Sequence, residues 1–322
     1  MRQGPGTAST EAAPGPSAVH TWGPLITLWI VWGTTYLGTS AMVQTMPPLV
    51  AAGSRYLLGG VILAAIMVIL RGPRVLSITG RQLANTLFLG LGLITIWASL
   101  VALALQHIPG GVAALIGATV PLWVVLLRAL SGQRVSGRTW FGVVLGIVGV
   151  AAMLLPGGIE AVADESPAKI VFWSLIVLVA SMTYSYFSWR TRFLDLPHNS
   201  LTTTFYQLLW GGTAIIVVGL LLGEGWLTGP YSLTSWAGFG WLVFASIVGY
   251  GVYVYLLQNV PLSLVSTFAF VNPVVAVLLG WLLLGEDFTR SVVIGLLVIV
   301  SGTALVVLGE SRPRGPAPAS EP

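Results

Sequence analysis

Arg55 is the one charged side chain well inside a long apolar run of this sequence, and it is the first candidate for chemistry. An arginine at the centre of a hydrocarbon layer costs roughly 2.5–3.5 kcal/mol on insertion scales, so a partner or a water-filled cavity has to compensate it. One interpretation makes Arg55 a gate or an anion contact. The other makes it a structural anchor that snorkels toward the nearer end of its helix and bonds to carbonyl oxygens.

Pro121 and Pro273 stand in the middle of two other apolar runs, where each predicts a helix kink. Proline has no N–H and frees the carbonyl one turn earlier, near Gly117 and Ala269. In lipid such a carbonyl needs another partner, so these kinks are expected to face a cavity or a neighbouring helix. Asn272 is a candidate partner or solute ligand, and the alternative is an interhelical hydrogen bond worth about 0.6 kcal/mol.

Aromatic residues near the middle of the runs are the other candidates for holding a small molecule. Most of the 13 tryptophans stand near the ends of runs, where interfacial belts form. Trp32 and Tyr36 share a helical face at i, i+4 spacing, with Thr35 beside them. A cavity lined in this way would suit neutral, zwitterionic or partly apolar solutes, and plain packing is the alternative for each side chain.

Other kinds of chemistry lack their residues. The chain has no cysteine, which excludes disulfides, thiolate metal sites and cysteine nucleophiles. His20, His107 and His198 are too far apart for helical spacing to bring two of them onto one metal, so no metal and no cofactor are expected. No Walker loop is present and no apolar run holds Asp or Glu. Coupling through His107, Glu286 or a backbone cation site, and facilitated movement down a gradient, all stay open.

Composition indicates which elements must position these groups. The chain has 322 residues, of which 56% are hydrophobic and 7% charged. A soluble domain carries roughly 25% charged residues because its surface faces water, so this surface is expected to face a lipid bilayer. The formal charge of +4 comes from arginines spread over short loops, without the stripe that a nucleic-acid partner would require.

Spanning a bilayer takes about 20 helical residues, and ten runs qualify within a few residues at each edge. They are 24–44, 49–70, 83–105, 111–130, 139–157, 170–189, 201–222, 236–257, 261–284 and 291–309. The first run is longer than a signal-peptide core of roughly 7–15 residues, so a retained signal anchor is the weaker interpretation. The tails 1–23 and 310–322 are rich in Gly, Pro, Ala and Ser and are expected to be disordered.

Positive charge assigns the two sides of the membrane. With the N-terminus inside, 11 Lys or Arg residues fall on the inner side and two on the outer side, as the positive-inside rule requires. The inner residues are Arg2, Arg71, Arg74, Arg81, Arg128, Arg134, Arg138, Arg190, Arg192, Arg312 and Arg314, and the outer ones are Lys169 and Arg290. The chain is therefore expected to cross a membrane many times, with both termini cytoplasmic.

The two halves of the chain repeat each other at a shift of 152 residues. Gly59-Gly60 matches Gly211-Gly212, the run 106–109 matches 258–261, and Pro121 matches Pro273; at a shift of 153, Gly132, Gly142 and Gly149 match Gly285, Gly295 and Gly302. The shift of 152 residues also equates Trp32 with Tyr184 and Arg55 with Gln207. Because each half holds five helices, the halves must be oppositely oriented, an arrangement typical of secondary transporters.

Several motifs resemble a known family. The segments WGTTY (32–36), the proline pair 47–48 followed by Arg55-Tyr56, and PGGVAALIGATVPLW (109–123) resemble the first EamA domain of the drug/metabolite transporter superfamily. The segments QLLWGG (207–212), VGYGVYVYLL (248–257) and 266–286 resemble the second. The likeness covers about residues 24–309 and is greatest to the subgroup marked by W-G-S-T-Y in its first helix.

The resemblance implies an all-α integral membrane protein of ten transmembrane helices, built as two inverted-topology five-helix EamA repeats. Its parts would be a tail (1–23), repeat 1 (24–157), an outer loop (158–169), repeat 2 (170–309) and a tail (310–322). Such a protein would lie in the cell (inner) membrane of a bacterium and export small metabolites, such as amino acids or related drug-like solutes, by alternating access. The family's cavity helices carry Trp97, Trp123, Tyr250 and Tyr253, which complete the solute-site candidates with Gln106. Here Leu105 stands before Gln106, where the subgroup often has glutamate.

Three other functions are alternatives to a transporter. A membrane-embedded enzyme would need clustered acids, histidines or an activated nucleophile. A scaffold would need an interaction domain and a channel a ring of polar residues, and the sequence shows none of these patterns.

Gly142, Gly146 and Gly149 give one helix a face of small residues. A homodimer through that face is an alternative to internal packing, which is favoured.

Overall fold

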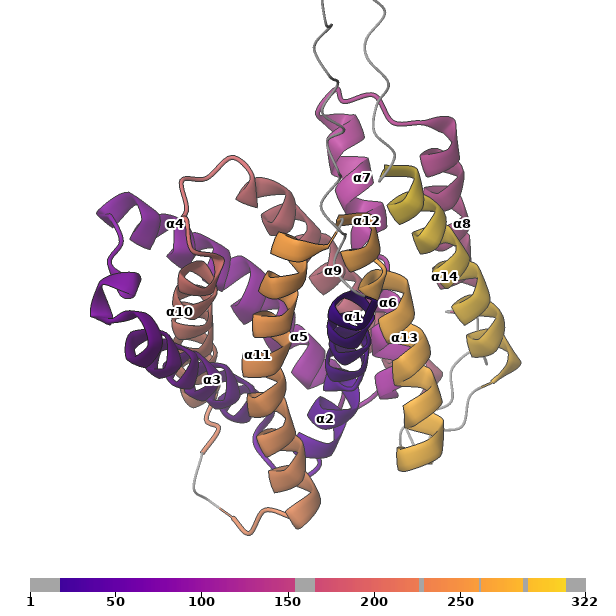
Figure 1. The fold of residues 1–322 in the computed structure, drawn as a ribbon. Helices are drawn as coiled ribbons and strands as arrows, with labels where there is room; N and C mark the ends of the chain where they lie inside the picture. The colour runs from indigo at the N-terminus through magenta and orange to yellow at the C-terminus, as the bar shows by residue number, and fades with distance from the viewer. Residues whose placement is uncertain (1–17, 154–165, 226–228, 261, 286–288, 311–322) are drawn as a thin grey trace, which may run out of the picture.

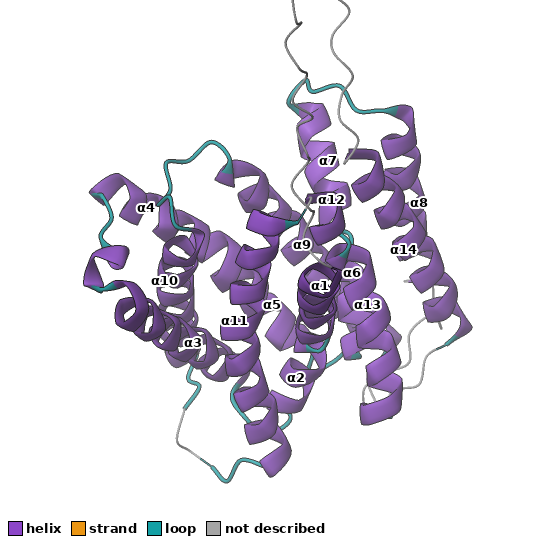
Figure 2. Cartoon of the chain, viewed as in Figure 1, coloured by secondary structure: helices purple, strands orange, loops and turns teal. Residues whose placement is uncertain are grey.

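In a computed structural model the chain is a bundle of α-helices. The structure describes residues 18–153, 166–225, 229–260, 262–285 and 289–310, and within them there is no β-strand (Figures 1 and 2). The helices are α1 (Ala18–Gly33), α2 (Thr35–Met42), α3 (Pro48–Arg71), α4 (Gly80–Leu89), α5 (Trp97–Ala104), α6 (Gly110–Gly117), α7 (Val120–Leu130), α8 (Gly137–Met153), α9 (Pro167–Thr191), α10 (Ser200–Leu221), α11 (Leu233–Asn259), α12 (Leu262–Val265), α13 (Phe268–Leu279) and α14 (Arg290–Glu310). A π-helix, Gly90–Ile96, joins α4 to α5, and another, Gly280–Leu284, extends α13.

These helices coincide with the predicted runs to within a few residues. Seven helical stretches of the described residues are long and apolar enough to cross a membrane: Pro48–Arg71, Gly80–Ala104, Gly110–Leu130, Pro167–Thr191, Ser200–Leu221, Leu233–Leu257 and Arg290–Val307. Gly137–Ala152 and Phe268–Leu283 are apolar but shorter. The predicted run 24–44 is divided between α1 and α2.

The first helix begins earlier than predicted. Residues 18–23 belong to α1, so assigning them to a disordered tail is wrong. The Thr27 hydroxyl donates to the Gly23 carbonyl at 2.9 Å, and the Trp22 and Trp29 rings meet edge to face at 6.4 Å. These contacts tie the first turns to the rest of the helix, which accommodates Pro24. At the other end, Glu310 belongs to α14 and not to the predicted tail. Residues 1–17, 154–165 and 311–322 lie outside the described residues.

Two of the predicted helices are interrupted. Gly33 ends α1 and Thr35 begins α2, while α6 ends at Gly117 and α7 begins at Val120. Pro121 is therefore in the first turn of a new helix, where its missing N–H costs least. By contrast, Pro273 lies inside the continuous helix α13, and the interruption in that half falls earlier, between α12 and α13.

Hydroxyl groups from neighbouring helices satisfy the backbone at the α6–α7 break. Ser181 and Ser185 of α9 donate to the carbonyl oxygens of Ile116 and Val120 at 3.2 and 3.0 Å. Thr303 of α14 donates to the Ala118 carbonyl oxygen at 3.0 Å. A broken helix is stable at membrane depth only if its freed carbonyls find such partners. The break is thus built into the packing of three helices.

Helices α3 and α10 pack with their backbones almost in contact. A Cβ placed on Gly53 would lie 2.6 Å from the Gly212 carbonyl oxygen, and one on Gly212 would lie 2.8 Å from Leu57 N. A Cβ on Gly60 would be 3.1 Å from Leu208 Cβ. Only glycine permits this approach, because the atoms it meets belong to the other backbone. In Figure 1 this pair lies at one edge of the bundle.

The neighbours of the paired glycines match between the halves. A Cβ on Gly59 would lie 2.9 Å from Ser246 on α11, and one on Gly211 would meet Ile94 of the π-helix. Ile94 and Ser246 are themselves 152 residues apart, so the two contacts are one contact made twice. The sequence repeat therefore corresponds to a repeat in the packing.

The glycine face of α8 is used inside the chain. A Cβ on Gly142 would lie 2.8 Å from the Gly302 carbonyl oxygen, and one on Gly149 would lie 2.8 Å from Ile299 Cγ1. Both partners are on α14, which runs beside α8 at the edge of the bundle opposite to α3 and α10 (Figure 1). Internal packing thus occupies the small residues through which a homodimer was predicted. A homodimer stays a prediction, but the glycine face of α8 does not support it.

Large apolar side chains point outward around the bundle. On α8 and α14 they include Phe141, Val148, Ile294 and Leu297, which are 54–63% exposed. Exposed apolar surface on so many helices is far beyond what a water-soluble monomer carries. The described helices therefore form a multi-pass membrane protein whose outer face meets lipid.

Candidate functional site

A cavity of about 330 Å³ lies within the bundle, between helices of both halves. Its walls come from α1, α2, α3, α5, α6, α7, α9, α11, α13 and the π-helix Gly90–Ile96. The predicted site residues that line it are Trp32, Thr35, Tyr36, Arg55, Trp97, Pro121, Tyr184, Tyr250, Tyr253, Asn272 and Pro273. The volume is at the lower end of the range for ligand pockets, about 300–1,000 Å³.

Four aromatic rings form one wall of the cavity. The Trp32 ring lies 5.0 Å from both Tyr253 and Phe268 and 5.7 Å from Tyr250, with Phe268 and Tyr250 edge to face. Below the cluster, the Trp29 indole N–H donates to Thr267 Oγ1 at 3.1 Å. Edge-to-face pairs gain about 0.5–1.5 kcal/mol beyond area burial, so this wall is a packed and rigid surface.

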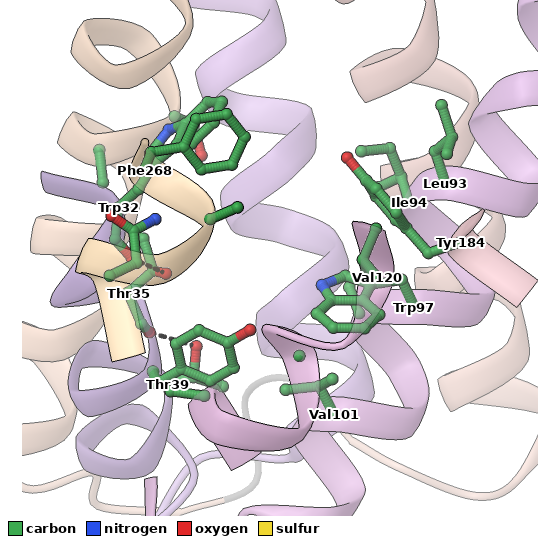
Figure 3. A pocket seen from close by; sticks show the side chains of 18 of the residues that line it. Trp32, Thr35, Thr39, Leu93, Ile94, Trp97, Val101, Val120, Tyr184 and Phe268 are labelled. Carbon is green, nitrogen blue, oxygen red and sulfur yellow. Dashed lines mark hydrogen bonds between the residues drawn. The ribbon is translucent and has the colours of Figure 1, made fainter. Parts of the chain in front are cut away.

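A second aromatic pair forms the opposite wall. The rings of Trp97 and Tyr184 lie 5.4 Å apart. Figure 3 shows them across the cavity from Trp32 and Phe268, with Leu93 and Ile94 beside Tyr184. The repeat that equates Trp32 with Tyr184 thus places one aromatic anchor on each wall. A flat apolar solute between them would contact rings on both sides.

Arg55 lies in the cavity wall although it is only 7% exposed. Its guanidinium carbon stacks 3.8 Å from the centroid of the Tyr56 ring, and Nη2 donates to the Tyr56 hydroxyl at 2.6 Å. Its Nε is buried without a hydrogen-bond partner. None of the lining residues is acidic. The cavity therefore carries one positive charge that no carboxylate in its wall balances.

Four tyrosine hydroxyls in the cavity, those of Tyr36, Tyr184, Tyr250 and Tyr253, make no hydrogen bond with the described residues. The threonines differ, because the hydroxyls of Thr35 and Thr39 donate to the Trp32 and Thr35 carbonyl oxygens at 2.7 and 2.8 Å. The tyrosine hydroxyls are thus among the polar groups of the wall that are available to a solute.

Asn272 links two helices at the edge of the cavity. In the amide orientation that satisfies its neighbours, its nitrogen donates to the carbonyl oxygens of Phe268 and Trp29, each at 3.3 Å. The bond to Trp29 joins α13 to α1, and such an interhelical bond is the alternative to a role of Asn272 as a solute ligand. The Asn272 amide oxygen keeps its capacity to accept from a solute, because Asn272 also lines the cavity.

The α6–α7 break opens directly onto the cavity. Gly117, Ala118, Val120 and Pro121 all line it. A Cβ on Gly117 would collide with the Tyr36 hydroxyl and lie 3.2 Å from Trp97. Glycine at this position therefore provides part of the cavity's space, and the Gly117 carbonyl has lost its helical donor because Pro121 has no N–H.

Two predicted site residues lie elsewhere. Gln106 is exposed in the turn after α5, and Trp123 donates through its indole N–H to Thr119 Oγ1 at 3.0 Å; neither lines the cavity. His107 stacks on Trp173 at 4.6 Å and is also outside it.

The sequence interpretation missed several lining residues, among them Thr39, Tyr56, Ser188, Ser246 and Phe268. Helical spacing could have found four of these. Thr39 follows Thr35 and Ser188 follows Tyr184 at i+4, while Phe268 precedes Asn272 and Ser246 precedes Tyr250 at i−4. Each therefore shares a helical face with a predicted site residue.

Together these features define a polytopic α-helical membrane transporter with a solute-sized internal cavity. The chain belongs to the EamA-like transporter family, whose model matches residues 23–155 and 170–308. The two matched segments are the two halves that the internal repeat separates. Membership of the W-G-S-T-Y subgroup stays a prediction.

Relatives of similar length support this assignment. The chain is 32% identical over 291 residues to the "Uncharacterized inner membrane transporter YedA" of Escherichia coli K12, covering 90% of this chain and 91% of the relative. It is 30% identical to "Protein PecM" of Dickeya dadantii, with 86% and 88% covered. It is 26% identical to a "Probable amino-acid metabolite efflux pump" of E. coli K12, with 87% and 92% covered. A solved crystal structure 19% identical in sequence shares the fold, with a TM-score of 0.62 over 91% of this chain and 99% of that one.

Proposed function

We propose that this protein is a secondary transporter that exports small metabolites from the cytoplasm by alternating access. The observation that carries the proposal is a cavity of about 330 Å³ whose walls come from matching helices of both halves. Rocking of two related halves about a shared site would expose that site to each side in turn. The cytoplasm-to-outside direction rests on the relative named as an efflux pump.

The proposed topology has ten spans, five in each half and oppositely oriented. Seven helical stretches qualify by length and composition, and α1 with α2, α8, and α13 with its π-helical extension supply the other three. An odd number of spans in each half inverts the second half relative to the first. The distribution of arginine then puts both termini in the cytoplasm.

The proposed solutes are compact metabolites such as amino acids or related neutral or zwitterionic compounds. The cavity wall is rich in aromatic side chains and has tyrosine hydroxyls among its free polar groups. A small number of placed polar groups in an apolar pocket is the usual arrangement for orienting a small ligand. The relative named as an amino-acid metabolite efflux pump is consistent with this class.

The absence of cysteine from the chain makes the topology directly testable. Ser77, in the connection between α3 and α4, and Ser166, just before α9, are both exposed. Single Ser77→Cys and Ser166→Cys variants should be labelled by a membrane-impermeant maleimide from the cytoplasmic and the outer side, respectively. Labelling of both from the same side would contradict the proposed topology.

Transport itself is tested by export. Cells that overproduce the protein should release one or more small metabolites faster than cells that produce an inactive variant at equal abundance. Untargeted mass spectrometry of the medium measures this without choosing the solute. A scaffold or a membrane-embedded enzyme acting on lipids would leave the medium unchanged, and that result would reject the proposal.

A further inference from the structure

The inference concerns the unbalanced charge in the cavity. Arg55 is the only Lys or Arg among the lining residues, and no Asp or Glu is among them. A cation that is 7% exposed in a low-dielectric wall is stable only with a counter-charge or with water. The acidic group next to the start of α3 is already engaged, because Glu224 accepts hydrogen bonds from Leu49 N and Val50 N at 2.8–3.2 Å.

Arg55 and Tyr56 together carry hydrogen-bond donors that no acceptor among the described residues occupies. The Tyr56 hydroxyl accepts from Arg55 Nη2 at 2.6 Å, so its own proton is free to point elsewhere. Arg55 Nε has no partner among the described residues, and both side chains line the cavity. A guanidinium beside a phenol hydroxyl offers N–H and O–H donors, and charge-assisted hydrogen bonds from such donors hold an anion.

The single positive charge of Arg55 and the volume of the cavity determine which anionic solutes fit. One cation balances a monoanion, whereas a phosphate dianion would leave a net negative charge buried in the wall. A planar carboxylate matches the fork of the guanidinium. The rest of the wall is apolar or aromatic, through Trp32, Tyr253 and Phe268, and takes the remainder of the solute.

We propose that Arg55 and the Tyr56 hydroxyl form a carboxylate subsite that makes the cavity selective for compact solutes with one carboxylate and an apolar body. This inference rests on the proposed function, because it names the group by which the transported solute is recognised. The repeat counterpart of Arg55 is Gln207, which is uncharged and does not line the cavity. The subsite therefore exists once, on the α3 side of the cavity.

The test uses purified full-length protein in liposomes and three matched pairs of solutes. The probes are phenylalanine, leucine and 3-phenylpropionate, each compared with its primary amide, and uptake is measured by mass spectrometry. The wild-type protein is expected to take up the carboxylates about 10- to 150-fold better than the amides, the range for a hydrogen bond to a charged group. Arg55→Gln is expected to reduce this ratio to near one.

Two further variants separate recognition from folding. Arg55→Lys keeps the charge and should retain part of the ratio, and Tyr56→Phe should lower the ratio by removing one donor only. Arg128→Gln is the matched control, since Arg128 donates to Gln133 Oε1 at 2.9 Å outside the cavity; it should leave the ratio unchanged. A ratio is independent of how much protein is folded, so a merely structural role of Arg55 would not alter it.

The possible failures are distinct. If the wild-type protein takes up amides as well as carboxylates, or if Arg55→Gln keeps the wild-type ratio, the carboxylate subsite is rejected and the transporter stands. If the wild-type protein takes up none of the six solutes and exports no metabolite from cells, the proposed function is rejected, and the subsite with it. If Arg55→Gln does not fold, the wild-type ratio and the Arg55→Lys and Tyr56→Phe variants still decide the question.

Discussion

Replacing Glu224 by glutamine is expected to loosen the junction between the two halves of the protein. Glu224 follows α10, in the second half, and its carboxylate accepts hydrogen bonds from Leu49 N and Val50 N at the start of α3, in the first half. Gly223 has φ +89°, a left-handed conformation that ends α10 and turns the chain toward α3. The carboxylate thus neutralises two free N–H groups at the positive end of a helix.

The size of the effect follows from these contacts. Hydrogen bonds to a charged group contribute about 1.5–3 kcal/mol when buried, and the helix-terminus charge contributes about 0.3–1 kcal/mol. Glu224 is partly exposed, which reduces both contributions. Glutamine retains one oxygen acceptor and loses the charge, so Glu224→Gln should lower the free energy of unfolding by about 1–2 kcal/mol. Glu224→Ala, which leaves both N–H groups without this acceptor, should cost more.

The measurement is equilibrium unfolding in mixed micelles, with Asp195→Asn as the control. Asp195 is also an acid in a connection, but it is exposed and its one side-chain contact, from Gln82 Nε2, is 3.4 Å long. Its replacement should change the free energy of unfolding by less than about 0.5 kcal/mol. Equal effects of the two substitutions would refute the argument, because they would show that the helix-terminus geometry contributes nothing beyond loss of a surface charge.

Three more predictions concern packing. Gly212→Ala should lower the free energy of unfolding by about 1–3 kcal/mol, because its Cβ would lie 2.8 Å from backbone atoms of α3. Gly240 is in a helical position where a Cβ would meet nothing within 4 Å, so Gly240→Ala should raise the free energy of unfolding by up to about 1 kcal/mol. Unfolding in mixed micelles distinguishes the two variants. Ser185→Ala should cost about 1 kcal/mol by removing the donor to the Val120 carbonyl at the helix break, and no loss of stability would show that the carbonyl finds another donor. Trp32→Ala removes three ring contacts and should enlarge the cavity, so that bulkier solutes are exported relative to small ones; an unchanged solute profile in the medium would contradict a role for this wall in selection.

The helices could be predicted from the sequence because desolvation is a strong constraint. A backbone in lipid must bond to itself, so every long run without charges has to be helical, and the observed helices follow the predicted runs. The paired glycines were informative for a similar reason. Gly59, Gly60, Gly211 and Gly212 stand where a neighbouring helix approaches within a methyl group's reach, and at Gly212 the atoms approached belong to the backbone of α3.

The breaks in the helices could not be placed from the sequence alone. Pro121 and Pro273 have the same register in the two halves, yet only the first lies at a break. What distinguishes them is tertiary: the hydroxyls of Ser181, Ser185 and Thr303 donate to the carbonyl oxygens of Ile116, Val120 and Ala118 at the first break. Those three donors come from helices that are remote in the sequence, and no local pattern announces them.

The positions where the two halves differ are the ones that give the cavity its chemistry. At a shift of 152 residues, Tyr250 and Tyr253 correspond to Ala98 and Val101, and all four line the cavity. The repeat thus supplies equivalent wall positions, and these two are aromatic in the second half but small or aliphatic in the first. Gly59-Gly60 and Gly211-Gly212 show the opposite behaviour, because these glycine pairs are kept in both halves. Symmetry is therefore preserved at these packing positions and lost where a solute would bind, since two inverted and identical walls would hold an asymmetric solute equally well in two orientations. A cavity that has to orient one carboxylate needs a positive charge on one wall only. Arg55 meets that requirement, because its counterpart in the other half, Gln207, is uncharged.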